Sequence, residues 1–473
     1  MRAATGFAVA AVLALVSGCT VGPDYVRPPI FAPEAYKETA AGWKIAQPRA
    51  DQLRGAWWEM FGDPQLNALE EQVDISNQNI AAAEAQYREA VAIVEEARAA
   101  YYPTVSIGVG VSRTRTPPSP GTGASTVNDY TLPINASWAP DVWGRVRRTV
   151  EENQANAQVS AADLEAARLS ARSTLAQDYF LLRTQDVQQQ LLDATVAAFE
   201  RSTKLTQNQY DAGVASRADV LQAQTLLETT RAQAVDVGIQ RAQFEHAIAV
   251  LVGQTASTFS LPPASLPTTP PDIPPGVPSE LLERRPDVAA AERSVAAANA
   301  AIGVAKAAYF PTIVLSAEGG FQSSSWARWL TLPMRFWSVG GTISETVYDA
   351  GLRSAQTEQA RAAHDASVAA YRQTVLAAFQ AVEDNLAALR LLAQEAKVQD
   401  AAVDLAKRTV VVITNQYKAG TVNYLNVVTA QTTALADERT AIGIRGSRMT
   451  SSVLLISALG GGWDTTRLPE AQP

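Results

Sequence analysis

This chain of 473 residues contains the same unit twice, and that repetition limits its possible folds more than any other feature. The segment AAYYPT at 99–104 returns as AAYFPT at 307–312, and QYDAG at 209–213 returns as QYKAG at 416–420. The spacing is 208 positions for the first pair and 207 for the second. Self-similarity at a fixed spacing indicates duplicated structural units. We therefore predict two repeats, at 65–253 and 280–462, related by a pseudo-twofold axis.

The segment between the repeats, 254–279, is rich in proline. Eight prolines fall between Thr255 and Ser279. This is too many for a helix and favours extended polyproline II structure at ~3.1 Å per residue. We expect this linker to wrap the outside of the molecule or to join two distant points.

Long helices are predicted in both repeats. The runs 144–211 and 351–418 contain 68 residues each without a proline, and their apolar positions recur every three or four residues, which is the period of a helix. At 1.5 Å per residue each helix would be ~100 Å long. The runs 66–102 and 216–252 have 37 residues each, so two of them end to end roughly match one long helix. Frequent charged and amide side chains argue against membrane-spanning helices.

The segments between the helices alternate with period two, as β-strands do. In VSIGVGVS at 105–112 every odd position is Val or Ile and every even position is Ser or Gly. The segments 130–138 and 313–321 continue the pattern, and 334–347 is a fourth candidate that alternates poorly. Four tryptophans lie near these strands, as in the aromatic girdle of a membrane barrel: Trp138, Trp326, Trp329 and Trp337.

Two interpretations of these strands are open, a membrane β-barrel and a soluble hairpin packed on a core. We favour lipid, because the small polar face of each strand offers little to pack against. Four strands cannot close a barrel, and an open edge in lipid leaves costly unpaired N–H and C=O groups. The chain must then oligomerise: two copies give eight strands and a filled lumen, and three give twelve strands and an opening.

The N-terminus indicates export and lipidation. Residues 1–18 combine Arg2 with a short apolar run and end in VSG before the only cysteine, Cys19, as a signal peptide with a lipobox does. Two or three acyl chains on Cys19 would anchor an extended segment, 19–64, to the membrane, since each buried methylene contributes roughly 0.8 kcal/mol. The alternative is a buried free thiol beside an ordinary cleavage site. Thr20 in place of Asp favours the outer membrane, by resemblance to lipoprotein sorting.

Composition removes several function classes. The chain has 39 Lys and Arg against 47 Asp and Glu, a net charge of −8, one cysteine and two histidines. An acidic chain is a poor partner for nucleic acid. So few Cys and His residues give no basis for a metal site or a disulfide, and His246 and His364 have no ligand spacing. Phosphate-binding loops and hydrolase motifs are missing from the sequence, so we predict no cofactor and no enzyme activity.

The sequence resembles the TolC-like outer-membrane factors, and among them the NodT-type efflux lipoproteins. The resemblance covers Cys19 to about Trp463, leaving 463–473 as a tail. It is carried by CTVGPDY at 19–25, WW at 57–58, FGDP at 61–64, LLERRPDV at 281–288 and the two Tyr-x-x-Gly turns at Tyr210 and Tyr417.

The resemblance implies a mainly α fold with a small membrane β-barrel. Three chains would form a twelve-stranded barrel, with four strands from each, and a twelve-helix periplasmic tunnel in the Gram-negative outer membrane. Such a homotrimer is the passive exit duct of a tripartite efflux system, docked to a periplasmic adaptor (membrane fusion) protein and an inner-membrane pump, which the resemblance implies to be of the resistance-nodulation-division (RND) class. The main alternative is a lipid-anchored periplasmic helical scaffold without a pore.

Both Tyr-x-x-Gly turns should form helix ends. Gly213 and Gly420 stand where a C-cap needs a left-handed residue. The pairs Ser216 with Asp219 and Asn423 with Asn426 indicate N-caps with polar partners three positions on. By the resemblance, these turns form the periplasmic tip, where Tyr210, Tyr417 and the capping residues make the closing contacts and meet the adaptor.

The resemblance also places the narrowest ring of the tunnel at the second turn. Acidic residues often line it in the family, whereas here the corresponding positions hold Val422, Asn426 and Thr429. We therefore expect a constriction with an apolar or amide lining at Val422, Leu425 and Thr429, and weaker cation selectivity.

Four arginines begin the two long helices: Arg145, Arg147, Arg148 and Arg353. Cations are unfavourable at a helix N-terminus. Either these side chains are simply solvated, or, as we hypothesise, they contact phosphates of outer-membrane lipid at the inner edge of the barrel.

Overall fold

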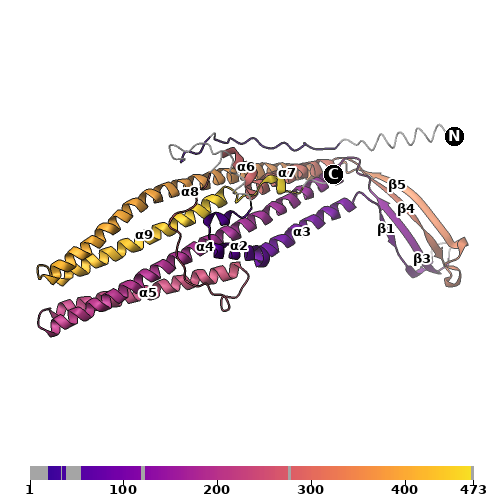
Figure 1. Ribbon diagram of the computed structural model, residues 1–473. Helices are drawn as coiled ribbons and strands as arrows, with labels where there is room; N and C mark the ends of the chain where they lie inside the picture. Colours follow the sequence, from indigo (N-terminus) through magenta and orange to yellow (C-terminus); the bar gives the residue numbers. More distant parts are fainter. Residues whose placement is uncertain (1–19, 34, 39–54, 119–122, 275–277, 470–473) are drawn as a thin grey trace.

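A computed structural model describes residues 20–33, 35–38, 55–118, 123–274 and 278–469. Cys19 and the predicted signal peptide lie outside these residues. The molecule is elongated: long helices form one end and the middle, and a sheet projects at the other end (Figure 1). Short 3₁₀ helices connect the larger elements: η2 (Trp57–Phe61), η3 (Pro278–Glu280), η4 (Trp326–Arg328), η5 (Leu332–Met334) and η6 (Thr465–Arg467).

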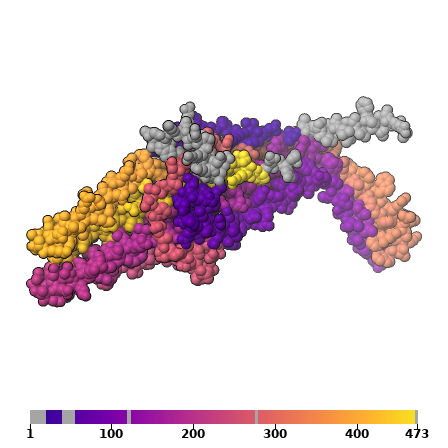
Figure 2. All heavy atoms as spheres, viewed as in Figure 1, coloured from indigo at the N-terminus to yellow at the C-terminus, as the bar shows by residue number. Residues whose placement is uncertain are grey.

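Two helices of 67 residues each, α4 (Arg145–Asp211) and α8 (Leu352–Lys418), run through most of the length. Each turns back into a helix of 35 residues, α5 (Arg217–Leu251) and α9 (Tyr424–Ala458) respectively. The bounds predicted for α4, α8 and α5 are confirmed to within about a residue, and α9 is the counterpart of α5 in the second repeat. The two resulting hairpins form adjacent lobes at the end far from the sheet (Figure 2).

The helix predicted at 66–102 is interrupted, so that part of the prediction is wrong. The structure has α2 (Pro64–Ser76) and α3 (Gln78–Ala99), with Asn77 between them. The Asn77 side chain accepts hydrogen bonds from the backbone N–H groups of Asn79 and Ile80. It thereby starts a new helix where the old one ends. In the second repeat the matching elements are α6 (Leu281–Arg284) and α7 (Pro286–Ala307).

The shorter helices join end to end, as their lengths suggested. The Asn77 side-chain amide donates to the carbonyl of Leu251 at the end of α5, at 2.8 Å. In the second repeat, Arg285 donates to the carbonyl of Ala458 at the end of α9, at 2.9 Å. These contacts couple α5 to α3 and α9 to α7. We call each contact a splice, and the two splices occupy equivalent positions in the two repeats.

A glycine makes each splice possible. Gly253 has a positive φ of 69°, and a Cβ there would lie 2.4 Å from the carbonyl oxygen of Ser76. Gly460 has a φ of 94°, and its Cβ would lie 2.0 Å from the carbonyl oxygen of Arg284. No side chain fits at either position, because the backbone of the facing helix occupies the space.

The strands form one antiparallel sheet, β1 (Thr104–Ile107), β2 (Gly110–Thr116), β3 (Ser125–Trp138), β4 (Thr312–Ser323) and β5 (Arg335–Ser344). The order is β1-β3-β4-β5, with β2 also paired to β3. The first two are one strand in a constant register, Ile107 opposite Ile134 and Gly110 opposite Thr131. The ladder breaks between them opposite Pro133, which has no N–H to donate. Four strand positions are therefore confirmed, and β3–β4 pairing joins the two repeats.

The main hydrophobic core lies at mid-length, where η2, α2, α4, α9 and the linker meet. Trp57, Leu175, Phe180 and Val453 are fully buried in it. Leu261 and Ile273 of the linker also belong to this core. Of the two paths expected for the linker, the one along the outside of the helices is confirmed.

Candidate functional site

One face of the sheet is apolar across all its strands. Val105, Ile107, Val109 and Val111 share it, and Ile107 is opposite Ile134 while Val111 is opposite Tyr130. The same face continues through these residues: Leu132, Ala136, Trp138, Ile313, Leu315, Ala317, Phe321, Trp337, Val339 and Ile343. We call it the apolar face.

The opposite face, which we call the polar face, carries Ser, Thr, Asn and Gly residues. Ser106 is opposite Asn135, which is opposite Glu318. Gln322 donates to both carboxylate oxygens of Asp129, at 3.1 and 3.2 Å. The sheet therefore separates an environment for hydrocarbon from an environment for water.

Apart from Trp326 and Trp329, which pack on Tyr130 at the far end, nothing in the described part of the chain covers the apolar face. Val105, Ile107, Val109 and Val111 are 66–70% exposed, and Val339 is 75% exposed. A soluble hairpin would bury this face on its own core, so the structure contradicts that alternative. Either lipid or another molecule must cover the surface.

Three of the four tryptophans mark two levels rather than one cluster, whereas Trp337, opposite Gly319 and so level with Ile134, lies between them. At the far end of the sheet, Tyr130, Trp326 and Trp329 contact one another with ring centroids 5.3–6.0 Å apart. At the helix end, the Trp138 ring nitrogen donates to the carbonyl of Tyr101 at 3.0 Å. Tyr130 and Trp138 are eight residues apart on β3, or roughly 27 Å along a strand, and rather less across a membrane if the strand is tilted. This separation suits two interfacial girdles around an apolar band.

At the opposite end of the molecule, both Tyr-x-x-Gly turns close their helices in the same way. Gly213 and Gly420 both have φ of 75°. Gly213 N–H donates to Tyr210 O, and Val214 N–H donates to Gln209 O, each at 2.8 Å. The second turn repeats both bonds between Gly420 and Tyr417 and between Thr421 and Gln416. These are Schellman caps, so the predicted C-caps are confirmed.

The N-caps that follow differ between the turns. Ser216 and Asp219 form a complete capping box, in which each side chain accepts from the other residue's N–H, at 3.2 and 3.0 Å. Asn423 accepts from the N–H of Asn426 at 3.3 Å. The predicted capping role is therefore confirmed at Ser216, Asp219 and Asn423, and Asn426 contributes its backbone N–H.

Tyrosines connect the two hairpins near the tip. Tyr417 donates to Gln209 on the other hairpin at 3.1 Å, and its ring packs edge-on against Tyr424 at 5.3 Å. The Tyr424 hydroxyl lies 3.2 Å from that of Ser202. Tyr210, at the equivalent position to Tyr417, is 39% exposed, and the Arg217 guanidinium lies 5.9 Å from its ring. The second turn is therefore fixed to the first, while Tyr210 remains accessible.

The residues expected at a constriction lie on the exposed side of α9. Leu425 is 51% exposed and Thr429 is exposed, whereas Tyr424 and Val427 on the opposite side are buried. Val422 is half-buried in the turn. A single chain thus leaves Leu425 and Thr429 free to face a shared axis.

The hypothesis that four arginines contact lipid phosphates is wrong for Arg148. Its side chain is buried, and it bonds to Asp24 at 2.9 Å and Glu151 at 2.7 Å. Gly303 makes room for it, since a Cβ there would lie 2.7 Å from Arg148 Cγ. The guanidinium is already paired with two carboxylates inside the protein and cannot reach a membrane.

The other three arginines are not equivalent. Arg353 pairs with Asp349 at 2.6 Å, and Arg147 pairs with Asp141 at 3.4 Å. The bond from Arg353 holds the pKa of the Asp349 carboxyl below its usual value. Arg145 is exposed. Lipid contact by Arg145, Arg147 and Arg353 stays a prediction.

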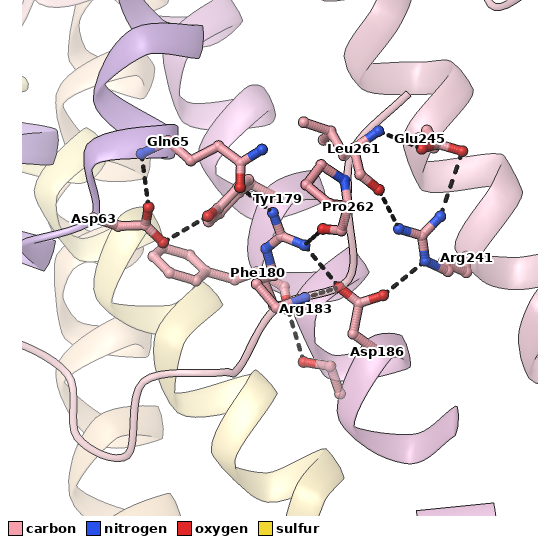
Figure 3. Close-up of polar contacts among 12 residues, drawn as sticks. Asp63, Gln65, Tyr179, Phe180, Arg183, Asp186, Arg241, Glu245, Leu261 and Pro262 are labelled. Atoms are coloured by element: carbon pink, nitrogen blue, oxygen red, sulfur yellow. Dashed lines mark hydrogen bonds and ion pairs between the residues drawn. The ribbon is translucent and has the colours of Figure 1, made fainter. Parts of the chain in front are cut away.

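Sequence reasoning missed a buried ion cluster at mid-length, formed by Arg183, Asp186, Arg241 and Glu245 (Figure 3). Arg183 and Asp186 are almost fully buried and pair at 2.7 Å, and Asp186 also pairs with Arg241 at 2.7 Å.

The linker completes this cluster. The carbonyls of Pro262 and Leu261 accept from Arg183 and Arg241 at 2.8 and 2.6 Å, and Leu261 N–H donates to Glu245 at 2.6 Å. The cluster thereby holds the linker against α4 and α5.

The start of α2 is held to the same place. Arg183 donates to Gln65 at 2.7 Å, and Tyr179 donates to Asp63 at 2.6 Å (Figure 3). Burial, together with the hydrogen bond to Asp63, raises the pKa of the Tyr179 hydroxyl. Four segments of the chain therefore meet at one set of charges.

The N-terminal segment lies along the outside of α7 and α8. Tyr25 donates to Glu292 on α7, and Arg27 donates to the Tyr371 hydroxyl on α8 at 3.3 Å. Asn299 donates to the carbonyl of Pro23 at 3.0 Å. The segment reaches the junction of helix and sheet, where Val21 N–H donates to Trp143 O at 3.3 Å. Lipidation of Cys19 falls outside the described residues and stays a prediction.

Membrane-spanning helices and metal-binding clusters are both absent from the described residues. None of the helices there is long and apolar enough to span a bilayer. In the same residues no group of three or more His, Cys, Asp or Glu side chains could hold a metal ion.

Comparison with known proteins assigns this arrangement to one family. Residues 69–254 and 277–461 match the profile of the family described as outer membrane efflux protein. The solvent efflux pump outer membrane protein SrpC of Pseudomonas putida is 31% identical over 470 residues, covering 96% of this chain and 98% of SrpC. The cation efflux system protein CusC of Escherichia coli is 28% identical over 473 residues, covering 95% and 96%.

A solved structure shows the same fold. The outer-membrane channel OprN superimposes with a TM-score of 0.88 at 30% sequence identity, covering 94% of this chain and 100% of the OprN chain. The predicted TolC-like fold is confirmed by this match.

Proposed function

Since the chain belongs to the outer membrane efflux protein family and acts as an efflux channel of the outer membrane, we propose that three copies assemble into one passive exit duct. The sheet would lie in the bilayer and the helices in the periplasm. The observation that carries the proposal is the uncovered apolar face on a sheet with two open edges.

The open edges require further copies. β1 and β2 form one edge and β5 the other. In hydrocarbon their unpaired N–H and C=O groups cost several kcal/mol each, so β5 of one copy must pair with β1 and β2 of the next until the ring closes. Three copies give twelve strands, enough for an open, polar-lined lumen.

The helices support the same count. Two continuous helices, α4 and α8, and two composite ones, α5 with α3 and α9 with α7, form four helical columns per chain. Three copies supply twelve columns for a tunnel below the barrel. Duplication makes such a tunnel pseudo-sixfold.

The partners that we propose are a periplasmic adaptor and an inner-membrane pump of the resistance-nodulation-division class. The tip offers the adaptor an accessible tyrosine, Tyr210, and the exposed first turns of α5 and α9. We propose no catalytic residues, because a passive duct only has to let cargo pass. Cargo choice would then rest with the pump.

Lipidation at Cys19 would fix the N-terminal segment to the membrane. Residues 20–22 lie beside the start of α4: Thr20 approaches Gly144, and Arg148 donates to the carbonyl of Val21 at 3.4 Å. An acyl group on the preceding residue would therefore enter the bilayer beside the barrel. Cys19→Ala should lose metabolic labelling by palmitate, and retained labelling would refute lipidation at this residue.

The duct is tested by planar-bilayer conductance of the purified protein together with its native mass. We expect the mass of three chains and stepwise channel currents. A monomer without current would refute the proposal and would favour a periplasmic scaffold. Digestion of whole cells by proteinase K gives a second test, since a spanning barrel exposes the connection from β2 to β3 outside, and this connection has no Lys or Arg for trypsin to cleave.

The constriction has a test of its own. Val422→Asp should raise cation selectivity, because it adds three carboxylates to one ring. Val214→Asp, at the other turn, is a matched control, since Val214 is 77% exposed and outside the proposed ring. Equal selectivity of both variants would show that Val422 does not line the narrowest point.

A further inference from the structure

We propose that the far rim of the barrel is a binding site for a phosphorylated lipid of the outer leaflet. The site consists of the distal arginines, Arg113, Arg115, Arg328 and Arg335, above the apolar face. This inference rests on the proposed function, because it requires the sheet to span the membrane with this end outward.

The strand register places the arginines on the lipid side. Arg113 and Arg115 follow Val111 at alternate positions, so they share its face of β2. Arg335 is opposite Phe321 and precedes Trp337 by two residues, so it also lies on the apolar face. All three stand at the strand ends that are farthest from the helices.

Charge is segregated between the two faces. The carboxylates of the described strands, Asp129 and Glu318, oppose Ser112 and Asn135 and so lie on the polar face. On the apolar face, the charged residues of the described strands are Arg113, Arg115 and Arg335. A random rim of solvated charges would mix the two signs on each side. The arrangement instead suits a ligand with hydrocarbon below and anionic groups above.

The distal arginines are available to bind an anion. All four are exposed, and within the described residues none forms an ion pair. They differ in this from Arg147, Arg148 and Arg353 at the helix end, which pair with carboxylates of the same chain. A guanidinium is well suited to bind phosphate oxygens through two hydrogen bonds.

The aromatic level completes the site. Trp326 and Trp329 pack on Tyr130 of the apolar face, and Arg328 lies between them in η4. Trp326 is 67% exposed, as an interfacial side chain should be. Closing the ring sets β5 beside β2 of the next copy, so Arg335 and Arg113 stand on neighbouring strands at each boundary between copies.

The test uses the purified full-length trimer in neutral phosphatidylcholine nanodiscs, titrated with diphosphorylated lipid A. We expect saturable binding that weakens at least about tenfold for lipid A stripped of its phosphates. Equal binding of both lipids would overturn the proposal without any variant. Displacement by millimolar inorganic phosphate would also overturn it, because the site would then bind free phosphate.

Variants locate the site. Arg113→Gln, Arg115→Gln and Arg335→Gln combined should weaken lipid A binding at least about tenfold. Arg361→Gln, Arg372→Gln and Arg408→Gln combined are the matched control, since these exposed arginines of α8 carry the same total charge. Equal weakening in both triple variants would refute a specific site.

Conductance separates this inference from the proposed function. A triple rim variant that conducts normally and binds lipid A poorly supports the site. A protein that conducts but binds lipid A no better than its dephosphorylated form refutes the site alone. If the wild type forms no channel, the proposed function fails first. Arg335→Lys keeps the charge but loses the paired hydrogen bonds of the guanidinium, so it should weaken lipid A binding less than Arg335→Gln does.

Discussion

The two splices give the sharpest stability prediction, and Gly253→Ala tests one of them. Gly213→Ala is its matched control. Both glycines have positive φ, 69° and 75°, so both alanines incur the cost of a left-handed conformation, about 1 kcal/mol. At Gly213 nothing lies within 4 Å of the new Cβ, whereas at Gly253 it would lie 2.4 Å from Ser76 O.

The clash at Gly253 has a definite consequence. The neighbouring atoms belong to the Ser76 backbone and Cβ, so no flexible side chain can yield. Relief requires the end of α5 to move away from the start of α3, which breaks the bond from Asn77 to Leu251. Overpacking costs about 1–3 kcal/mol and the lost hydrogen bond about 1 kcal/mol. We therefore expect Gly253→Ala to open the splice by about 2 to 4 kcal/mol more than the control.

Amide hydrogen exchange measures this directly. A difference of about 2 kcal/mol corresponds to roughly 30-fold faster exchange. Peptides covering 73–81 and 248–254 should exchange that much faster in Gly253→Ala, whereas Gly213→Ala should affect only the tip. If the two variants exchange within threefold of each other at the splice, the steric reasoning is refuted.

Three further predictions concern single side chains. Ser216→Ala removes one half of the capping box and should cost about 1 kcal/mol, visible as faster exchange and proteolysis at residues 214–221; unchanged cleavage there would contradict the cap. Asp186→Ala leaves the buried Arg183 without its carboxylate and should destabilise the protein by about 3–5 kcal/mol, measured by thermal unfolding. Asp193→Ala, which removes an exposed carboxylate of the same helix, should have little effect, and an equal loss would argue against the cluster. Glu70 is fully buried, neither of its carboxylate oxygens has a hydrogen-bond partner in the described structure, and burial raises its pKa well above the usual value. The folded state therefore holds this proton more tightly than the unfolded state, so stability falls as the pH rises from about 4.3 through the folded pKa. Glu70→Gln should flatten the unfolding-temperature profile above a pH of about 4.3, and the exposed Glu71→Gln should not; identical profiles would remove Glu70 as the cause.

The sequence predicted those parts of the fold that local patterns determine. The alternation of apolar and small polar residues identified the strand at 105–112. Such a pattern arises because each face of a strand meets one environment along its whole length. The cap residues around Gly213 and Ser216 are recognisable because the turn geometry demands them. The long helices are continuous for the same reason, since nothing in 145–211 interrupts helical periodicity.

Long-range contacts account for what the sequence could not predict. Asn77 lies in a polar stretch that continues the helical period, and only the arriving end of α5 turns it into a break. Arg183 and Asp186, three positions apart, look like a surface pair; the linker that buries them comes from about 80 positions away. Arg145, Arg147 and Arg148 are indistinguishable in sequence, and only the N-terminal segment and Gly303 decide that Arg148 is the buried one.

Pairing of β3 with β4 has a consequence for biogenesis. Asp129 and Gln322, which meet across it, are 193 positions apart, so this contact has a very high contact order and forms late. Until α4, α5, the linker and α7 are in place, the apolar strands of a newly exported chain remain unpaired and prone to aggregate. A periplasmic chaperone that shields them would therefore matter more to the yield of this protein than the speed of helix formation.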